Sequence, residues 1–173
     1  MKKLLALCAL IILIFQSQAQ TLKTFKDIKS GKIVKTASLT LTPPTEALKQ
    51  TIKFVSKGSE KSIYIETLIK VYDEDLKNTY QYEGITVMFS FEDKKSFTLP
   101  IEKNLSSFKD LPNKGHFVSI GLKITDEQLN YFLKYSLLQI TVLATPQNGV
   151  VLRQPENEMA NQLKNCAAYV LVP

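Results

Sequence analysis

Two side chains in this sequence belong to types that commonly act as a general base or a nucleophile, His116 and Cys166. His116 is the only histidine among the 173 residues, and it stands at the start of a run of alternating apolar residues. A hydrolytic triad would need this histidine as its base. No Gly-x-Ser-x-Gly segment accompanies it, and Ser119-Ile120-Gly121 has only half of that pattern. We therefore interpret His116 as a strand-end residue.

Cys166 is spaced from Met159 and Leu163 so that all three share one face of a helix. Free cysteines are among the most buried residue types, so we interpret Cys166 as a small buried residue rather than a reactive thiol or a dimer contact. The other cysteine, Cys8, lies in an apolar N-terminal run. A zinc site needs several His and Cys ligands. We predict no catalytic residue, no metal site and no cofactor.

Paired carboxylates are the one catalytic arrangement that this composition permits. A glycosidase needs two carboxyl groups that the fold holds about 5–10 Å apart, whatever their spacing in the sequence. Asp73-Glu74-Asp75 and Asn78 resemble part of a calcium loop, but the turn glycine and the terminal glutamate are missing. We interpret this segment as a solvated turn. The lack of tryptophan for sugar stacking makes a small secreted hydrolase the second hypothesis rather than the first.

Four tyrosines form the best candidate for a surface that binds a ligand or a partner. Tyr64 and Tyr72 alternate onto the less apolar face of one expected strand, and Tyr80 and Tyr82 lie on one side of the segment that follows. If the two segments pair, the four rings form an exposed stripe, and aromatic rings beside polar groups are frequent at binding surfaces. The alternative is that this face is the second side of a sandwich core.

Positive charge is concentrated near the start of the chain. Without Lys2 and Lys3 there are 20 basic and 16 acidic residues, and the segment 20–36, with five lysines and one aspartate, accounts for the whole excess. Lysines alternate there with apolar residues, in the order Leu22, Lys23, Phe25, Lys26, Ile28, Lys29 and Lys32. This pattern permits surface attachment to an anionic membrane or polymer. The interpretation we favour is a solvated leader whose three apolar residues dock on the domain.

Residues 1–19 have the three parts of a cleavable signal peptide. Lys2 and Lys3 give a positive start, residues 4–15 are an unbroken apolar run, and Ser17-Gln18-Ala19 places small residues where signal peptidase reads them. The apolar run has 12 residues, whereas a helix needs about 20 to cross a bilayer. We therefore expect export to the periplasm, the cell surface or the extracellular medium.

Alternation of apolar and polar residues dominates the chain beyond a basic leader at 20–32, and it predicts β-strands. The alternating stretches are 37–41, 52–54, 63–71, 85–91, 97–101, 118–124, 138–145 and 150–152. Helical spacing predicts two short helices, at 126–136 and 155–167. Residues 33–173 are thus expected to form a single β-rich domain of the α+β class. We predict a mostly antiparallel, two-layer, sandwich-like sheet of about eight strands.

Three local features complete the predicted fold. Thr125 and Gln128 form a capping box at the start of the first helix. The segment 104–115 is predicted as a loop, and the segment from Tyr169 to Val172 as a last short strand. The strand, helix and strand between residues 116 and 145 fit either a right-handed crossover within one sheet or a connection between two sheets.

Together these observations favour an exported, non-catalytic binding or structural module of the bacterial cell envelope, with a protein or a glycan as its partner. The single arginine, Arg153, argues against nucleic-acid recognition, where arginine is favoured. Contact with a membrane surface through the basic leader is permitted. The alternatives are the small hydrolase with paired carboxylates and a carrier of a small apolar ligand.

Processing of the signal peptide is directly testable. We expect the protein exported by an expressing Gram-negative cell to begin at Gln20, because Ala19 is the last small residue of the cleavage pattern. Intact-mass spectrometry of the envelope fraction measures this. Replacing Ala19 with Arg should leave residues 1–19 attached, and an unprocessed wild-type chain would contradict the prediction.

Overall fold

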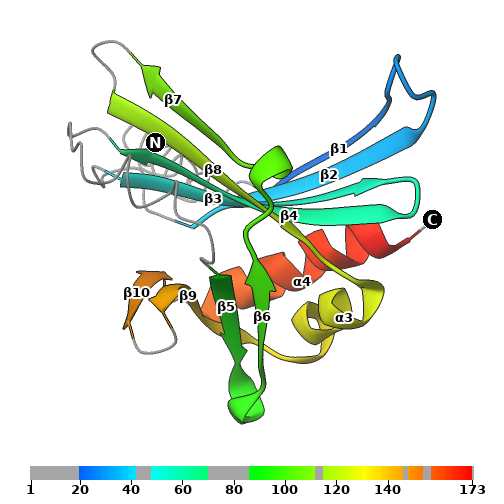
Figure 1. Ribbon diagram of the computed structural model, residues 1–173. Coiled ribbons are helices and arrows are strands. Elements are labelled where there is room, and N and C mark those ends of the chain that lie inside the picture. The colour runs from blue at the N-terminus through cyan, green and yellow to red at the C-terminus, as the bar shows by residue number, and fades with distance from the viewer. Residues whose placement is uncertain are drawn as a thin grey trace, which may run out of the picture.

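The structure is a computed structural model that describes residues 20–41, 48–69, 86–111, 115–145, 148–153 and 157–172. In these ranges the chain forms two antiparallel sheets with two α-helices beside them (Figure 1). The predicted α+β, mostly antiparallel and sandwich-like fold is confirmed. The described residues contain ten strands, whereas the sequence predicted about eight.

The larger sheet has six strands, and each neighbouring pair is antiparallel. Their order is β1 (Thr21–Lys26), β2 (Ile33–Thr40), β3 (Leu48–Lys57), β4 (Glu60–Ile69), β8 (Gly115–Lys123) and β7 (Ser107–Leu111). Side chains alternate between the two faces of a strand, so one face carries the apolar residues. The buried apolar residues of this face include Ala37, Leu39, Ile52, Phe54, Ile63, Ile65, Val118, Ile120 and Leu122.

The smaller sheet has four strands, in the order β10 (Asn148–Arg153), β9 (Leu137–Thr145), β5 (Thr86–Phe91) and β6 (Ser96–Pro100). Strands β5 and β6 pair antiparallel and form a hairpin. Its turn contains the short 3-10 helix η2 (Glu92–Lys94), where Asp93 and Lys94 have φ angles of 61° and 58°. Val87, Phe89 and Phe91 of β5 point into the core.

Helix α3 (Asp126–Lys134) begins at the predicted capping box. The backbone N–H of Gln128 donates to Thr125 Oγ1 at 3.2 Å, and the backbone N–H of Thr125 donates to Gln128 Oε1 at 3.0 Å. These two bonds satisfy donors that the first turn of a helix leaves free. The sequence therefore predicted the start of this helix correctly.

Helix α4 (Asn157–Leu171) is the last element, and it extends past the predicted end at residue 167. The short strand predicted from Tyr169 to Val172 is wrong, because Tyr169 to Leu171 form the last turn of this helix. Val170 is buried at helical spacing from Leu163 and Cys166. Burial of this apolar face outweighs the weak strand preference of the last residues.

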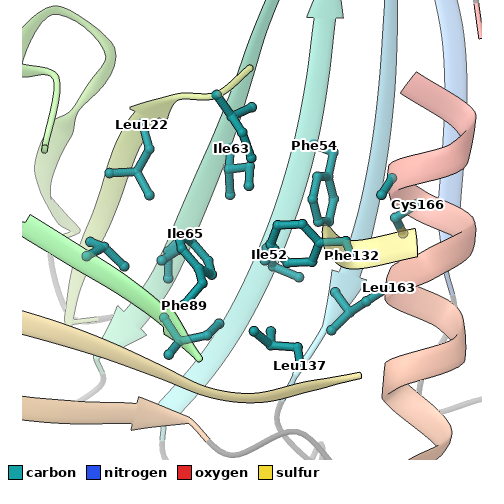
Figure 2. Close-up of a cluster of buried hydrophobic side chains, with 14 of the residues drawn as sticks. Ile52, Phe54, Ile63, Ile65, Phe89, Leu122, Phe132, Leu137, Leu163 and Cys166 are labelled. Atoms are coloured by element: carbon teal, nitrogen blue, oxygen red, sulfur yellow. The ribbon is translucent and has the colours of Figure 1, made fainter. Parts of the chain in front are cut away.

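The core lies between the larger sheet on one side and α4, α3 and the smaller sheet on the other (Figure 1). Phe132 of α3 is at its centre, with ring centroids 5.2 Å from Phe54, 5.6 Å from Phe89 and 5.1 Å from Phe91. The rings meet edge to face, which aromatic pairs prefer. Figure 2 shows Phe132 and Phe54 beside Leu163 and Cys166 of α4.

The segment predicted as a loop at 104–115 contains the edge strand β7, preceded by the 3-10 helix η3 (Lys103–Leu105). The prediction of a loop is therefore wrong at residues 107–111. Strand β7 escaped the sequence pattern because it is only five residues long and carries charged residues, as short edge strands often do. The helix α3 joins β8 of the larger sheet to β9 of the smaller sheet. Of the two alternatives for this passage, the connection between two sheets is therefore confirmed.

Close packing of η3 on β8 explains Gly121, the glycine of the incomplete hydrolase motif. A Cβ atom at Gly121 would lie 2.3 Å from Leu105 Cβ and 2.6 Å from the Leu105 carbonyl oxygen. The backbone N–H of Gly121 donates to Ser106 Oγ at 3.0 Å, and the N–H of Glu102 donates to the Gly121 carbonyl at 2.9 Å. The glycine therefore serves a close backbone approach.

The Gly121→Ala variant should lower the free energy of unfolding by about 1–3 kcal/mol, because the added methyl group overlaps η3. Urea denaturation of the purified protein measures this. Ser119→Ala, on the same face of the same strand, removes atoms instead of adding them and should cost less. Equal losses from the two variants would show that η3 does not pack as described.

Candidate binding surfaces

Tyr64 lies near the middle of the larger sheet, on the face opposite the core. It belongs to β4 and stands between Lys53 of β3 and Gly121 of β8 in the hydrogen-bonded register. Its strand neighbours Ile63 and Ile65 are buried on the other face, whereas Tyr64 keeps partial exposure. Tyr64 is therefore placed where a ligand can contact it.

Lys53, Tyr64 and Glu66 form a polar group that we call the Tyr64 cluster. Lys53 Nζ lies 3.2 Å from Glu66 Oε1 and 5.6 Å from the centre of the Tyr64 ring. The ammonium thus makes an ion pair and a cation–π contact together. Sequence reasoning missed Lys53, because only the pairing of β3 with β4 brings it beside Tyr64.

The other predicted tyrosines, Tyr72, Tyr80 and Tyr82, lie outside the described residues, as does the acidic segment 73–78. The proposed stripe of four rings therefore stays a prediction. Tyr131 and Tyr135 of α3 pack at the edge of the core, with ring centroids 5.7 Å apart.

The predicted basic leader is an integral part of the larger sheet. Residues 21–26 form β1, which pairs along its whole length with β2. The docking predicted for the three apolar residues does not occur, because Leu22, Phe25 and Ile28 are 46%, 51% and 99% exposed. The backbone hydrogen bonds between β1 and β2 hold this segment in the sheet, so it does not need to bury apolar side chains to be ordered.

The four lysines named for surface attachment all lie on this hairpin and are exposed. Lys23 and Lys26 belong to β1, and Lys29 and Lys32 belong to the turn that follows. Lys32 Nζ lies 3.5 Å from Glu60 Oε1, between two exposed side chains. Such a pair contributes little to stability, so Lys32 remains available to other anions.

The turn between β1 and β2 is organised by the carboxylate of Asp27. Its Oδ1 accepts hydrogen bonds from the backbone N–H groups of Lys29, at 2.8 Å, and Ser30, at 3.3 Å, while Oδ2 pairs with Lys57 Nζ. The Lys57 ammonium and then these backbone bonds lower the pKa of Asp27 to about 2. The ionised Asp27 carboxylate therefore supports the turn fully at a pH above 3.8, the ordinary pKa of the group. This support is lost as the pH falls toward 2.

His116 lies near the start of β8, as the sequence predicted. The backbone register places it opposite Asp110 of the edge strand β7 and opposite Ile69 of β4. Sequence reasoning missed the neighbour Asp110, because it had interpreted that segment as a loop. Within the described ranges, no three His, Cys, Asp or Glu side chains gather closely enough to hold a metal ion.

Cys166 faces the core, as its helical spacing predicted, and its side chain is fully buried. Burial raises the pKa of its thiol to about 11, and a hydrogen bond of 3.3 Å from Gln20 Nε2 offsets part of the rise. Because the thiolate is the reactive form, this cysteine is a poor nucleophile at neutral pH.

Comparisons with protein-family models, with curated proteins and with solved structures find no match to this chain. In the part of the chain that the structure describes, no helix is both long and apolar enough to span a membrane.

Thiol labelling tests the placement of Cys166. We expect Ellman's reagent to react with the folded, exported protein at least about a hundred times more slowly than with the same protein in 8 M urea, because native reaction requires opening of the core. Absorbance at neutral pH follows the reaction. Fast labelling of the native protein would contradict the packing of α4 on the sheet.

Proposed function

We propose that this protein is an exported, non-catalytic binding module of the bacterial cell envelope, and that it holds a protein or a glycan on the Tyr64 cluster. The observation that carries this proposal is the contact of Lys53 with both Glu66 and the Tyr64 ring on the sheet face opposite the core. Export rests on the signal peptide predicted at residues 1–19.

The Tyr64 cluster has the chemistry of a recognition surface. A partly exposed ring offers apolar area together with a hydroxyl group, at a small cost in conformational entropy. The ion pair between Lys53 and Glu66 has side-chain exposures of 35% and 24%, so both charges are partly shielded from water. Either charged group can form a hydrogen bond to a polar partner while its ion-pair neighbour stays beside it.

The rigidity of the surrounding sheet supports the same proposal. Tyr64 and Glu66 belong to β4, which has a hydrogen-bonded neighbour on each side, and Lys53 belongs to β3, which also has two. Side chains on such strands are held in place before a ligand arrives, which lowers the entropy that binding must overcome.

Photo-crosslinking in the living cell tests the proposal for a protein partner. A benzophenone side chain in place of Tyr64 should form a covalent adduct with one envelope protein, because the ring faces outward there. The same group in place of Leu138, which is 50% exposed on the smaller sheet, is the matched control. Identical adducts from both positions, or none from position 64, would count against a protein partner.

Co-sedimentation with purified peptidoglycan tests the proposal for a glycan partner. We expect Tyr64→Ala to weaken binding about tenfold or more, since truncating a tyrosine at the centre of a binding surface commonly costs about 2 kcal/mol or more and about 1.4 kcal/mol is a tenfold change in affinity. Tyr131→Ala, which alters the core edge, controls for loss of stability, and thermal unfolding is followed for both. If neither partner class depends on Tyr64, the proposed function is wrong.

A further inference from the structure

Exposed apolar side chains gather at the turn between β1 and β2. The structure describes six exposed large hydrophobic residues, and four of them, Leu22, Phe25, Ile28 and Ile33, lie in this hairpin. Ile28, at the turn itself, is 99% exposed, and Ile33 is 60% exposed. Single exposed apolar residues are ordinary, but a local cluster of them marks an interaction site.

Three lysines lie among these apolar residues. Lys26, Lys29 and Lys32 are exposed, and within the described residues Lys26 and Lys29 have no ion-pair partner. The single acidic residue of the turn, Asp27, is engaged by Lys57. The tip of the hairpin, which we define as residues 25–33, therefore combines apolar groups with uncompensated positive charge.

The tip is fixed in shape before it meets any ligand. The backbone N–H of Asp27 donates to the Lys32 carbonyl at 2.9 Å, and that of Gly31 donates to the Asp27 carbonyl at 2.8 Å. Gly31 has a φ of 67°, which a glycine adopts readily. A rigid turn loses little entropy when it binds.

The stem of the hairpin is held against α4. The hydroxyl groups of Thr24 and Tyr169 lie 2.5 Å apart, and Lys35 Nζ donates to the Val172 carbonyl at 2.7 Å. Figure 1 shows the turn between β1 and β2 projecting from the sheet, away from α3 and the smaller sheet. The body of the protein therefore presents the tip outward.

We propose that this tip attaches the protein to the anionic surface of a lipid bilayer, with Phe25, Ile28 and Ile33 entering the headgroup layer and Lys26, Lys29 and Lys32 contacting lipid phosphates. This attachment goes beyond the proposed function, because it concerns a different surface. Apolar residues with interleaved cations are the pattern of interfacial binding. Charge complementarity with anionic lipids supplies the second attraction.

A bilayer suits the tip better than a protein partner. The core of a protein interface is depleted of lysine, whereas three of the nine residues of the tip are exposed lysines. A phosphate-rich polymer would engage the lysines but would leave Ile28 without a role. A bilayer accommodates both the lysines and the apolar side chains, because its phosphates contact the lysines and the acyl chains beneath them take up the apolar side chains.

Vesicle co-sedimentation tests the proposal with the exported, processed protein. The probe is vesicles with 30% phosphatidylglycerol in phosphatidylcholine, compared with pure phosphatidylcholine. We expect binding to the anionic vesicles that weakens as NaCl rises from 0.05 to 0.5 M, because salt screens exposed charges. The triple variant Lys26→Gln, Lys29→Gln, Lys32→Gln should weaken binding about a hundredfold, at about fivefold per lysine.

Matched controls separate the tip from net charge and from general hydrophobicity. The triple variant Lys95→Gln, Lys103→Gln, Lys109→Gln removes the same charge from exposed positions elsewhere and should change binding less than about threefold. Ile28→Ser should weaken binding about tenfold, whereas Leu138→Ser should not, although Leu138 is 50% exposed. Thermal unfolding confirms that each variant is folded.

Three results would overturn the proposal. The first is equal binding to anionic and neutral vesicles, and the second is equal loss from the tip variants and their controls. The third is a dimer that depends on Ile28 in sedimentation velocity without vesicle binding, because the tip or the open edge of β1 would then pair with a second copy of this chain. None of these outcomes involves Tyr64, so the proposed function and this attachment fail separately.

Discussion

Burial of one face of the larger sheet is the constraint on which the rest of the structure depends. Helix α4 packs on β2 and β3, and Phe132 of α3 brings Phe54 of the larger sheet together with Phe89 and Phe91 of the smaller one. Because side chains alternate along a strand, a core on this face places every second residue on the other face. The position of Tyr64 outside the core follows from the burial of Ile63 and Ile65.

Helix α4 also fixes the N-terminal strand, by a different kind of contact. All six residues of β1 are exposed, so apolar burial contributes little to holding this strand. Instead, Gln20 and Thr24 make polar contacts with Cys166 and Tyr169 of α4. The first and last described segments therefore depend on each other, and the strand can keep apolar side chains exposed without losing its place in the sheet.

The sequence predicted those parts of the fold that depend on local patterns. Strands with a buried face alternate clearly, and the capping box of Thr125 and Gln128 needs only residues three apart. The pattern failed at β7, a five-residue edge strand, and at the last turn of α4, where packing decided the conformation. Lys53 and Asp110 were missed as neighbours of Tyr64 and His116, because only the strand register reveals such pairs.

One rigid sheet joins the two proposed surfaces. The tip lies at the edge strand β1, and Tyr64 lies on β4, three hydrogen-bonded strands away. At about 4.8 Å per strand, this separation is about 14 Å across the sheet. The side chain of Phe25 lies on the same face of the sheet as that of Tyr64. The register connects Phe25 through Val34 to Lys57 of β3, and it connects Tyr64 to Lys53 of the same strand. Lys53 and Lys57 are an even number of residues apart, so they share a face. Tyr64 also lies four register positions along the strands from Phe25, about 14 Å in that direction. A protein attached through its tip would therefore hold Tyr64 at a fixed distance of about 20 Å from the inserted residues, where envelope proteins and glycans are within reach.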